Sequence, residues 1–421
     1  MAETLLAALD IGSSKIGTLV GIKSEDEPMI RIIGFNSTVS RGVKRGLIID
    51  IDQVTASIEE SVEKAERMAG HKITKVFVGV GGPHIASLNS HGVVAVSNPQ
   101  GEISGADIER VVEAARAISL SQTKQIIEVT PREFIVDGQT GIKNPVGMTG
   151  VRLEVDTHII TASQTNLKNI DRALSLLGLD NQGFIFSAVA AADAVLTDTE
   201  KELGVVLVDL GGGKTDICIY VDGALSYSSS IPIGARHITN DIAVGLRVSL
   251  DSAEKIKLYV SQNFEKKAKT FKKDEELNFV QLGLPEHVTD VSLKTLIDGI
   301  IAARIEEIFK LIFDEIEKSE FTSNIPSGLV ITGGGAETVG LLQIEKKVLG
   351  LPVRIGIPEG VTGLIDEIVN PQNATLVGLL IRGQDLIIDE KGFKNFDKIL
   401  KDFSGGFNLT KVKDFFKQFI P

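Results

Sequence analysis

The chain is 421 residues long, 43% of them hydrophobic and 24% charged, with 44 Lys and Arg against 56 Asp and Glu. This composition is typical of a soluble globular protein with two or more domains, and the net charge of −12 argues against nucleic-acid binding. Cys218 is the only cysteine, which excludes a disulfide framework, and we expect it to be a small buried residue. The sequence has no basic leader and no apolar run long enough to span a bilayer, so we expect a cytoplasmic protein.

Strands and helices are expected to alternate along the chain. Strands are predicted within residues 5–35, followed by a helix over 52–69 in which Val54, Ile58 and Val62 recur at helical spacing. Further segments are predicted as a strand over 75–82, a helix over 104–118, a hairpin over 126–160, a helix over 164–177, strands over 204–210 and 214–221, and a helix over 251–260.

This order predicts an α/β fold of two related halves, each interrupted by an insertion. The expected first-half core covers residues 1–82 and 163–202 around an inserted subdomain at 83–162. The expected second-half core covers residues 203–235 and 327–383 around a mainly helical insertion at 236–326, and residues 384–421 form a linker and a C-terminal helix.

A short glycine-rich turn occurs twice and carries the strongest functional signal. It reads LDIGSSKIG over residues 9–17 and VDLGGGKTDI over residues 208–217. Glycines let backbone amides approach a phosphate closely, and two such turns facing each other can hold a nucleotide from both sides. A P-loop does not fit, because Val208 stands where its first glycine belongs and a strand, not a helix, follows the second turn.

The two turns supply the candidate phosphate contacts, and an Asp precedes each turn at the end of a strand. Asp10 and Asp209 are the candidates for a magnesium ion, held directly or through water. The candidate phosphate contacts are Gly12, Ser13, Ser14 and Lys15 from the first turn and Gly211, Gly212, Gly213, Lys214 and Thr215 from the second, with Gly234 added to the nucleotide-binding set.

A third glycine turn follows another predicted strand. Gly333, Gly334, Gly335 and Ala336 precede a helix predicted over residues 337–349, which would allow the backbone to lie against a purine or ribose.

Glu254 and Lys257 lie three residues apart on a predicted helix. On the residues alone a solvated ion pair is the better interpretation, and contact with adenosine is the alternative.

Together these elements resemble the superfamily of actin and the DnaK chaperones, and within it the FtsA family of bacterial cell division. The segments PREFIVDGQTGIKNPVGMTGVRLEVDTHIIT (131–161) and GGPHIASLNSHGVVAVS (81–97) carry this likeness, and NPVGM (144–148) is its most distinctive part. The resemblance covers residues 5 to 383. It implies an ATP- and Mg²⁺-binding cleft between the halves and favours Glu254 and Lys257 as adenosine contacts.

The resemblance also implies a role at the division site. Members of this family polymerise and tether FtsZ filaments to the cytoplasmic face of the membrane as peripheral proteins. The insertion at 83–162 would serve self-association and contacts with later division proteins. The insertion at 236–326 would bind the C-terminal peptide of FtsZ along a helix near residues 292–313, with Arg304, and less strongly Lys294, meeting its acidic residues.

One position departs from the filament-forming relatives such as MreB. Those proteins carry an acid where this chain has Ser187, which is a poor general base, and Asp193 lies six residues further on and is expected to face elsewhere. We therefore expect ATP to bind and to be hydrolysed slowly or negligibly.

The C-terminal end has an amphipathic pattern. Six apolar residues fall on one side of a helical wheel and lysines on the other, which favours insertion into an anionic membrane over docking on the protein itself. These residues are Leu409, Val412, Phe415, Phe416, Phe419 and Ile420. Residues 391–403 repeat apolar residues at helical spacing too, and they could bind the membrane or pack on the globular body.

Two alternatives remain open at this point. A PilM-like scaffold of pilus assembly would share the insertion topology, and a small-molecule kinase of the same superfamily would share the phosphate turns. The NPVGM segment and the C-terminal pattern argue against the first, and nothing in the sequence supplies a substrate pocket for the second.

Overall fold

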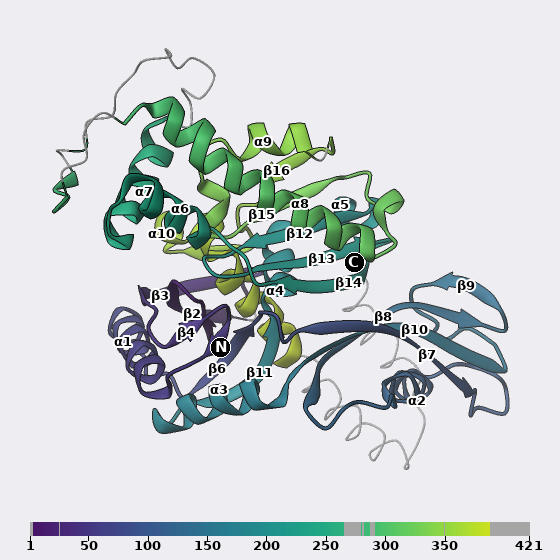
Figure 1. Cartoon of the computed structure of the whole chain (residues 1–421). Helices are drawn as coiled ribbons and strands as arrows, with labels where there is room; N and C mark the ends of the chain where they lie inside the picture. Colours follow the sequence, from purple (N-terminus) through teal and green to yellow (C-terminus); the bar gives the residue numbers. More distant parts are fainter. Residues whose placement is uncertain are drawn as a thin grey trace.

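Two large sheets, each in its own half of the molecule, dominate the computed structural model (Figure 1). It describes residues 3–24, 26–264, 279, 282–286, 291–348 and 350–387. The first-half sheet has the order β11–β6–β1–β2–β3–β17. Its strands are β1 (Glu3–Ile11), β2 (Lys15–Ser24), β3 (Ile30–Val39), β6 (Lys75–Val80), β11 (Asp180–Phe186) and β17 (Val361–Gly363).

The second-half sheet repeats this plan in the order β14–β13–β12–β15–β16. Its strands are β12 (Val205–Leu210), β13 (Thr215–Val221), β14 (Ala224–Ile231), β15 (Leu329–Thr332) and β16 (Val353–Ile355). In both sheets three antiparallel strands follow one another along the chain, and parallel strands pair on the other side of the first of them. Even the register corresponds, because Asp10 lies opposite Gly17 and Asp209 lies opposite Asp216. The expected pair of related halves is confirmed.

Amphipathic helices cover the first-half sheet. The predicted helix over residues 52–69 is α1 (Ile51–Ala69), whose buried face includes Val54, Ile58 and Val62. It begins at Asp50, which accepts a hydrogen bond from the Gln53 amide, and ends at Gly70 in the left-handed conformation. The other elements here are β4 (Val43–Lys44), β5 (Leu47–Ile48) and α3 (Gln164–Leu176).

A separate four-stranded sheet, ordered β7–β10–β8–β9, forms the inserted block and extends to one side of the first half (Figure 1). Its elements are β7 (Ala86–Ala95), α2 (Gly105–Arg116), β8 (Lys124–Val136), β9 (Gln139–Ile142) and β10 (Arg152–Ser163). The insertion also contacts the second half. The Ser87 hydroxyl donates to the Ser228 carbonyl at 2.6 Å, the Asn89 amide donates to the Ser226 carbonyl at 3.3 Å, and His158 Nε2 lies 3.0 Å from Ser228 Oγ.

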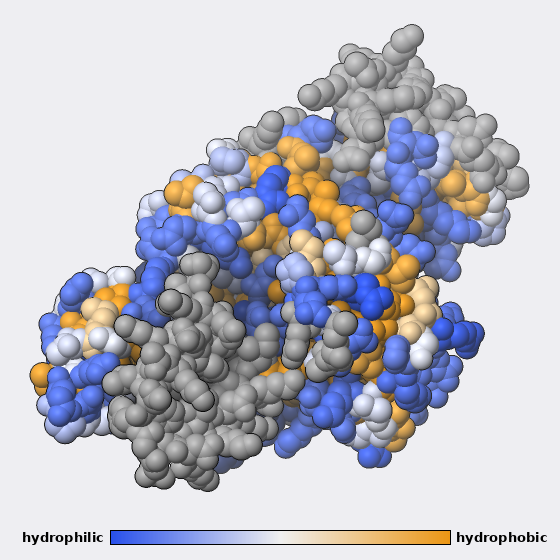
Figure 2. Space-filling model, turned by 180° about the vertical axis from the view of Figure 1, so that it is seen from behind, coloured by the Kyte–Doolittle hydropathy of each residue, from blue (hydrophilic) through white to orange (hydrophobic). Residues whose placement is uncertain are grey.

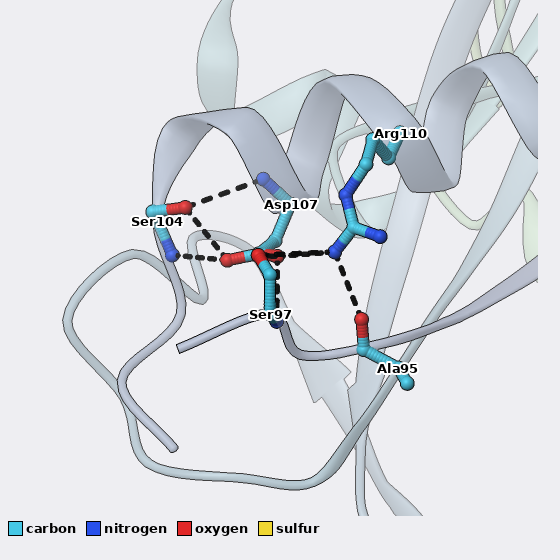
Figure 3. A network of polar contacts seen from close by, with 5 residues as sticks. All are labelled: Ala95, Ser97, Ser104, Asp107 and Arg110. Atoms are coloured by element: carbon cyan, nitrogen blue, oxygen red, sulfur yellow. Dashed lines mark hydrogen bonds and ion pairs between the residues drawn. The ribbon is translucent and has the colours of Figure 1, made fainter. Parts of the chain in front are cut away.

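The start of α2 is fixed by one buried carboxylate (Figure 3). Asp107 accepts hydrogen bonds from the Ser104 and Ser97 hydroxyls, both at 2.6 Å, and pairs with Arg110 at 2.5 Å. Burial alone would raise the pKa of Asp107, but these partners outweigh it and hold the pKa well below its ordinary value. The loop from Ser97 to Ser104 is thereby fastened to the helix that follows it.

The described residues of the second insertion are mainly helical. It contains α6 (Arg236–Leu246), α7 (Leu250–Phe264), a π-helical stretch η3 (Thr295–Ile301) and α8 (Ala302–Lys318). The buried face of α8 includes Ile305, Ile308, Phe309 and Ile312, and it belongs to the same core cluster as the second-half sheet.

Two helices cross the space between the large sheets. The first is α4 (Ser187–Val195), in which every residue except Asp193 is buried. The second spans residues 374–387, and its Leu376, Leu379 and Leu380 belong to the first-half core. A Cβ on Gly378 would lie 1.6 Å from the Ala190 carbonyl oxygen, so only glycine allows this approach.

The last part of the described chain moves between the halves. After β16, the strand β17 pairs in parallel with β3 of the first half, and residues 374–387 then pack on that half. The segment expected to complete the second-half core thus crosses over at Val361. The remaining elements are α5 (Asp198–Leu203), η4 (Thr322–Asn324), η5 (Gly334–Glu337), α9 (Leu341–Val348), α10 (Ile365–Ile368) and η6 (Pro371–Asn373).

One predicted boundary is wrong. The helix expected over residues 337–349 begins at Leu341, because a 3₁₀ turn covers Gly334–Glu337 and Thr338 is extended. Gly340, with a φ of +81°, then redirects the chain into the helix. No helix among the described residues combines the length and apolar character that crossing a bilayer requires.

The crossing at Gly378 generates the first prediction. Replacing Gly378 with Ala forces the two central helices apart and is expected to lower the free energy of unfolding by about 1–3 kcal/mol. Denaturant unfolding measures this loss. Gly105→Ala is the matched control, because a Cβ there meets nothing within 4 Å. Equal stability of the two variants would contradict the proposed tight crossing.

Candidate functional site

The first glycine turn joins β1 to β2 and is closed by a hydrogen bond from the Gly12 amide to the Lys15 carbonyl at 3.0 Å. A Cβ on Gly12 would lie 2.7 Å from that carbonyl oxygen, so the turn needs glycine. The Ser13 hydroxyl accepts a hydrogen bond from the Gly46 amide at 3.0 Å. The sequence provides only small residues, Gly12, Ser13 and Ser14, at the tip of this tight turn.

The second turn joins β12 to β13 and repeats the closure, with the Gly211 amide donating to the Lys214 carbonyl at 3.0 Å. The amides of Ala235 and Arg236, at the start of α6, donate to the carbonyls of Gly211 and Gly212 at 2.9 and 2.8 Å. Gly234 is buried at this contact, where its Cβ would lie 2.4 Å from the Gly211 carbonyl oxygen. In this structure Gly234 therefore packs against the second turn.

The two turns meet across the boundary between the halves. A Cβ on Gly212 would lie 2.0 Å from Ser14 Oγ, and one on Gly213 would lie 2.8 Å from the Ser13 Cβ. Thr215 is buried and donates its hydroxyl hydrogen bond to the Ile233 carbonyl at 2.8 Å. The sequence prediction that the two turns face each other is thus confirmed by their contact.

Five charged side chains surround this contact. Burial raises the pKa of Asp10 and lowers that of Lys15, so each ionised group lacks part of its usual solvation. Burial also raises the pKa of Asp209 to about 6. Burial alone would lower the pKa of Lys214, but Asp216, Asp209 and Asp10 raise it above its ordinary value.

Lys214 pairs with Asp216, a residue that the sequence analysis did not select. Asp216 also accepts a hydrogen bond from Ser230 at 2.5 Å. Both charged groups lie against Gly81 at the end of β6, where a Cβ would lie 2.1 Å from Lys214 Nζ. Side chains alternate along β13, so Asp216 lies on the sheet face opposite that of Thr215. This alternation is the sequence signal that could have identified Asp216.

The third turn approaches the same acids. Gly333 has a φ of +84°, and a Cβ there would lie 2.3 Å from Asp209 Oδ1. Gly335 and Ala336 are buried in the 3₁₀ turn that follows, and a Cβ on Gly335 would lie 2.4 Å from the Leu210 side chain. Gly334 has more room, because a Cβ there would lie 3.8 Å from Gln372 Cβ.

Residues 370–375, which lead into the last described helix, supply further contacts that sequence reasoning missed. Lys15 Nζ donates to the Gln372 carbonyl at 2.8 Å and to Asn373 Oδ1 at 3.1 Å, and the Thr375 hydroxyl donates to Asp209 at 3.1 Å. Asn370 caps this segment by accepting a hydrogen bond from the Gln372 amide. The Asn-Pro pair at its start was the signal for a helix N-terminus here.

Glu254 and Lys257 form an ion pair at 2.8 Å on α7. Thr239 on α6 joins them, because its hydroxyl donates to Glu254 at 2.5 Å and accepts from Lys257 at 3.0 Å. Glu254 keeps 42% of its side chain exposed against 10% for Lys257, so the carboxylate is the more accessible of the two. Adenosine contact by this pair stays a prediction.

The start of α4 carries no acid. Ser187 is buried, and its hydroxyl donates to the Val80 carbonyl at 3.1 Å. Asp193 faces away from the turns, as expected, and pairs with Lys201 at 3.1 Å and Arg382 at 3.0 Å. His84, also missed by sequence reasoning, lies near the turns, and burial lowers its pKa to about 4.

The predicted partner contacts lie elsewhere. Arg304, on α8, pairs with Asp241 of α6 at 2.5 and 2.9 Å and with Glu307 at 2.5 Å. Lys294 is exposed just before η3. The predicted membrane contacts Leu409, Val412, Phe415, Phe416, Phe419 and Ile420 lie outside the described residues, as do residues 391–403.

The arrangement fits a magnesium-bound nucleoside phosphate. Glycines let the three turns approach one another closely, Lys15 and Lys214 supply positive charge for an anion, and two carboxyl groups with raised pKa lie beside them. Asp10 and Asp209 are oxygen donors of the kind that Mg²⁺ prefers. An anion with its cation would offset the charges that burial now leaves incompletely solvated.

Comparison with known protein families gives two matches. A family model described as the SHS2 domain inserted in FtsA matches residues 82–161, and one described as cell division protein FtsA matches residues 206–378. The cell division protein FtsA of Pseudomonas aeruginosa is 37% identical over 379 residues, covering 90% of this chain and 89% of that protein.

Solved structures show the same fold. The PilM–PilN type IV pilus biogenesis complex contains a chain with a TM-score of 0.61 at 16% identity, covering 90% of this chain and 98% of its own. MreB 5 of Spiroplasma citri bound to AMPPNP gives a TM-score of 0.53 at 13% identity, covering 93% and 98%. At these identities the likeness establishes the actin-type ATPase fold and no more, which confirms the predicted fold class.

The raised pKa of Asp209 generates the second prediction. The ionised carboxylate destabilises the folded protein above pH 6, and this cost disappears as the pH falls toward 4, where folded and unfolded states both bind the proton. Asp209→Asn is therefore expected to raise the stability of nucleotide-free protein by about 1–3 kcal/mol at pH 8.

Thermal unfolding at pH 8 and pH 5 measures this effect, and the gain should shrink at pH 5. Asp26→Asn is the matched control, because Asp26 is exposed. A gain that is equal at both pH values, or a loss at pH 8, would refute the assignment.

Proposed function

The chain belongs to the FtsA family of cell division proteins, and we propose that it binds ATP with Mg²⁺ between its halves and tethers FtsZ filaments to the cytoplasmic face of the membrane. One observation carries the nucleotide part. The turns 12–15 and 211–215 touch each other beside the buried side chains of Asp10 and Lys15, which burial leaves poorly solvated. The solved MreB 5 relative of the same fold is bound to AMPPNP.

In the proposed complex the backbone amides of the glycine turns bind the phosphates. Lys15 and Lys214 hold them by charge, and Asp10 and Asp209 contribute oxygen ligands to Mg²⁺, directly or through water. The bound ion supplies positive charge that neutralises the phosphates. Lys15 would exchange its contacts with Gln372 and Asn373 for the anion, which links the ligand to the last described helix.

Hydrolysis is proposed to be slow. A general base has to lie within hydrogen-bond reach of the attacking water. The Ser187 hydroxyl donates a hydrogen bond to the Val80 carbonyl, and Asp216 already contacts Lys214 and Ser230. ATP would then act chiefly by holding the halves together, and a polymer-competent surface would follow from that closure.

The FtsZ tail is proposed to bind the helical insertion. Arg304 lies on α8 and pairs with Asp241 of α6, the helix that also carries Val244, which is 80% exposed. Because Asp241 now neutralises Arg304, an acidic peptide would replace one carboxylate with another and add apolar contacts. Lys294, exposed before η3, would contribute a second, weaker contact.

Membrane attachment is proposed for the C-terminal residues 405–421. The support is their sequence alone, in which six apolar residues oppose lysines on a helical wheel. The insertion at 83–162 is proposed to serve self-association and the recruitment of later division proteins, since it projects from the body as a separate sheet.

Nucleotide binding yields the third prediction. Lys15→Gln is expected to weaken binding of ATP with Mg²⁺ about 10- to 100-fold, the effect of losing one contact to a charged group. Titration calorimetry measures the affinity. Lys23→Gln on the same strand is the control, because Lys23 donates to the turn carbonyls of Glu27 and Pro28 at the far end of that strand. Unchanged affinity in K15Q would contradict the proposed site, and rapid steady-state phosphate release by the natural chain would contradict the proposed slow hydrolysis.

The tether role yields the fourth prediction. The full chain is expected to sediment with anionic liposomes and to carry a peptide copying the FtsZ C-terminus. Deleting residues 405–421 should abolish sedimentation, whereas Arg304→Gln should abolish only peptide capture. Lys310→Gln on the same helix is the control for charge. A full chain that stays soluble and ignores the peptide would overturn the tether role.

A further inference from the structure

A cavity of about 690 Å³ lies between the two halves at the C-terminal end of α4, at the opposite end of that helix from Ser187 and the glycine turns. We propose that residues 391–403 of this same chain dock in this cavity. The proposal goes beyond membrane binding and ATP binding, because neither is needed for the contact to form.

The walls of the cavity combine apolar and polar side chains and come from both halves. Met29 and Ile30 lie at the start of β3, Val195 lies at the end of α4, and Ile357 follows β16. Met29 is 45% exposed and Ile357 is 47% exposed, which is unfavourable for large apolar side chains in water. Hydrophobic residues break up the hydrophilic surface of the face seen in Figure 2. Residues 391–403 offer matching apolar side chains, namely Phe393, Phe396, Ile399, Leu400 and Phe403.

The charges of the cavity and the segment are complementary. Asp193, Glu359 and Asp385 line the cavity against the single basic residue Arg354, a balance of −2. The segment 391–403 carries four Lys and two Asp, a balance of +2. The opposite charges of the cavity and the segment favour this pairing over binding of an acidic peptide in the cavity.

The chain itself delivers the segment to the cavity. Ile381, Gln384 and Asp385 of the last described helix line it, and the described part of the helix ends two residues later at Ile387. Five residues separate Ile387 from Phe393, and an extended chain of that length reaches about 16–18 Å. Such a short connection gives an effective concentration of about a millimolar, so a weak contact suffices for occupancy.

Docking in this cavity would assign residues 391–403 to the globular body and not to the membrane. They would pack on the body, and only the residues after Ser404 would be left for another surface. Because the cavity is walled by both halves, the fit of the segment would also depend on the angle between them.

Cysteine cross-linking in the full chain, without nucleotide or liposomes, tests the proposal. Cys218 is fully buried and burial raises the pKa of its thiol well above the ordinary value, so the natural cysteine stays unreactive. Met29→Cys is combined with Phe396→Cys and treated with a short bismaleimide. Leu176→Cys with Phe396→Cys is the matched control, because Leu176 is exposed on α3 of the same half.

We expect an intramolecular cross-link in the monomer with Met29→Cys and none with Leu176→Cys. Adding Ile357→Lys at this half-exposed position removes an apolar contact and places a charge of the same sign as that of the segment, so it should remove the cross-link. Equal cross-linking in both pairs, no cross-link with Met29→Cys, or a cross-link found only between two chains would each overturn the proposal. ATP titration and liposome sedimentation of the same variants measure the proposed function separately, so its failure is distinguishable.

Discussion

The approach of two helix backbones at Gly378 and Ala190 sets the geometry on which the other features depend. Strands β1 and β12 end in their glycine turns on either side of this crossing, and α4 contacts strands of both sheets. A side chain at residue 378 would force α4 and the last described helix apart. Because α4 contacts strands of both sheets, a shift of this helix would act on both of the halves that carry the glycine turns.

The charged residues at the turns have the opposite character to this apolar crossing. Burial raises the pKa of Asp10 and Asp209 and lowers that of Lys15, which means that folding alone leaves these groups poorly solvated. A protein that places ionised groups where they cost stability generally uses them for binding or chemistry. The same free energy that destabilises the empty site is available to draw a nucleotide and its cation into it.

The parts of this structure that repeat or follow a simple period could be predicted from the sequence. The two glycine turns were visible because Asp10 and Asp209 introduce the same pattern, and α1 was visible because apolar residues recur along one face. The contacts of Gln372 and Thr375 were not, since they join residues more than 150 positions apart. The late start of α9 at Leu341 and the crossing of β17 to β3 depend on tertiary packing that no local pattern encodes.

The hydrogen bonds between the inserted sheet and β14 make the insertion a bridge between the two halves. It is joined covalently to the first half, yet Ser87, Asn89 and His158 fasten it to Ser226 and Ser228 of the second. Burial lowers the pKa of His158 to about 3, so this ring stays neutral and the fastening does not respond to physiological pH. If the halves rotate relative to each other, the insertion either loses these hydrogen bonds or moves with the second half. The orientation of the insertion therefore reports how the two halves are placed relative to each other.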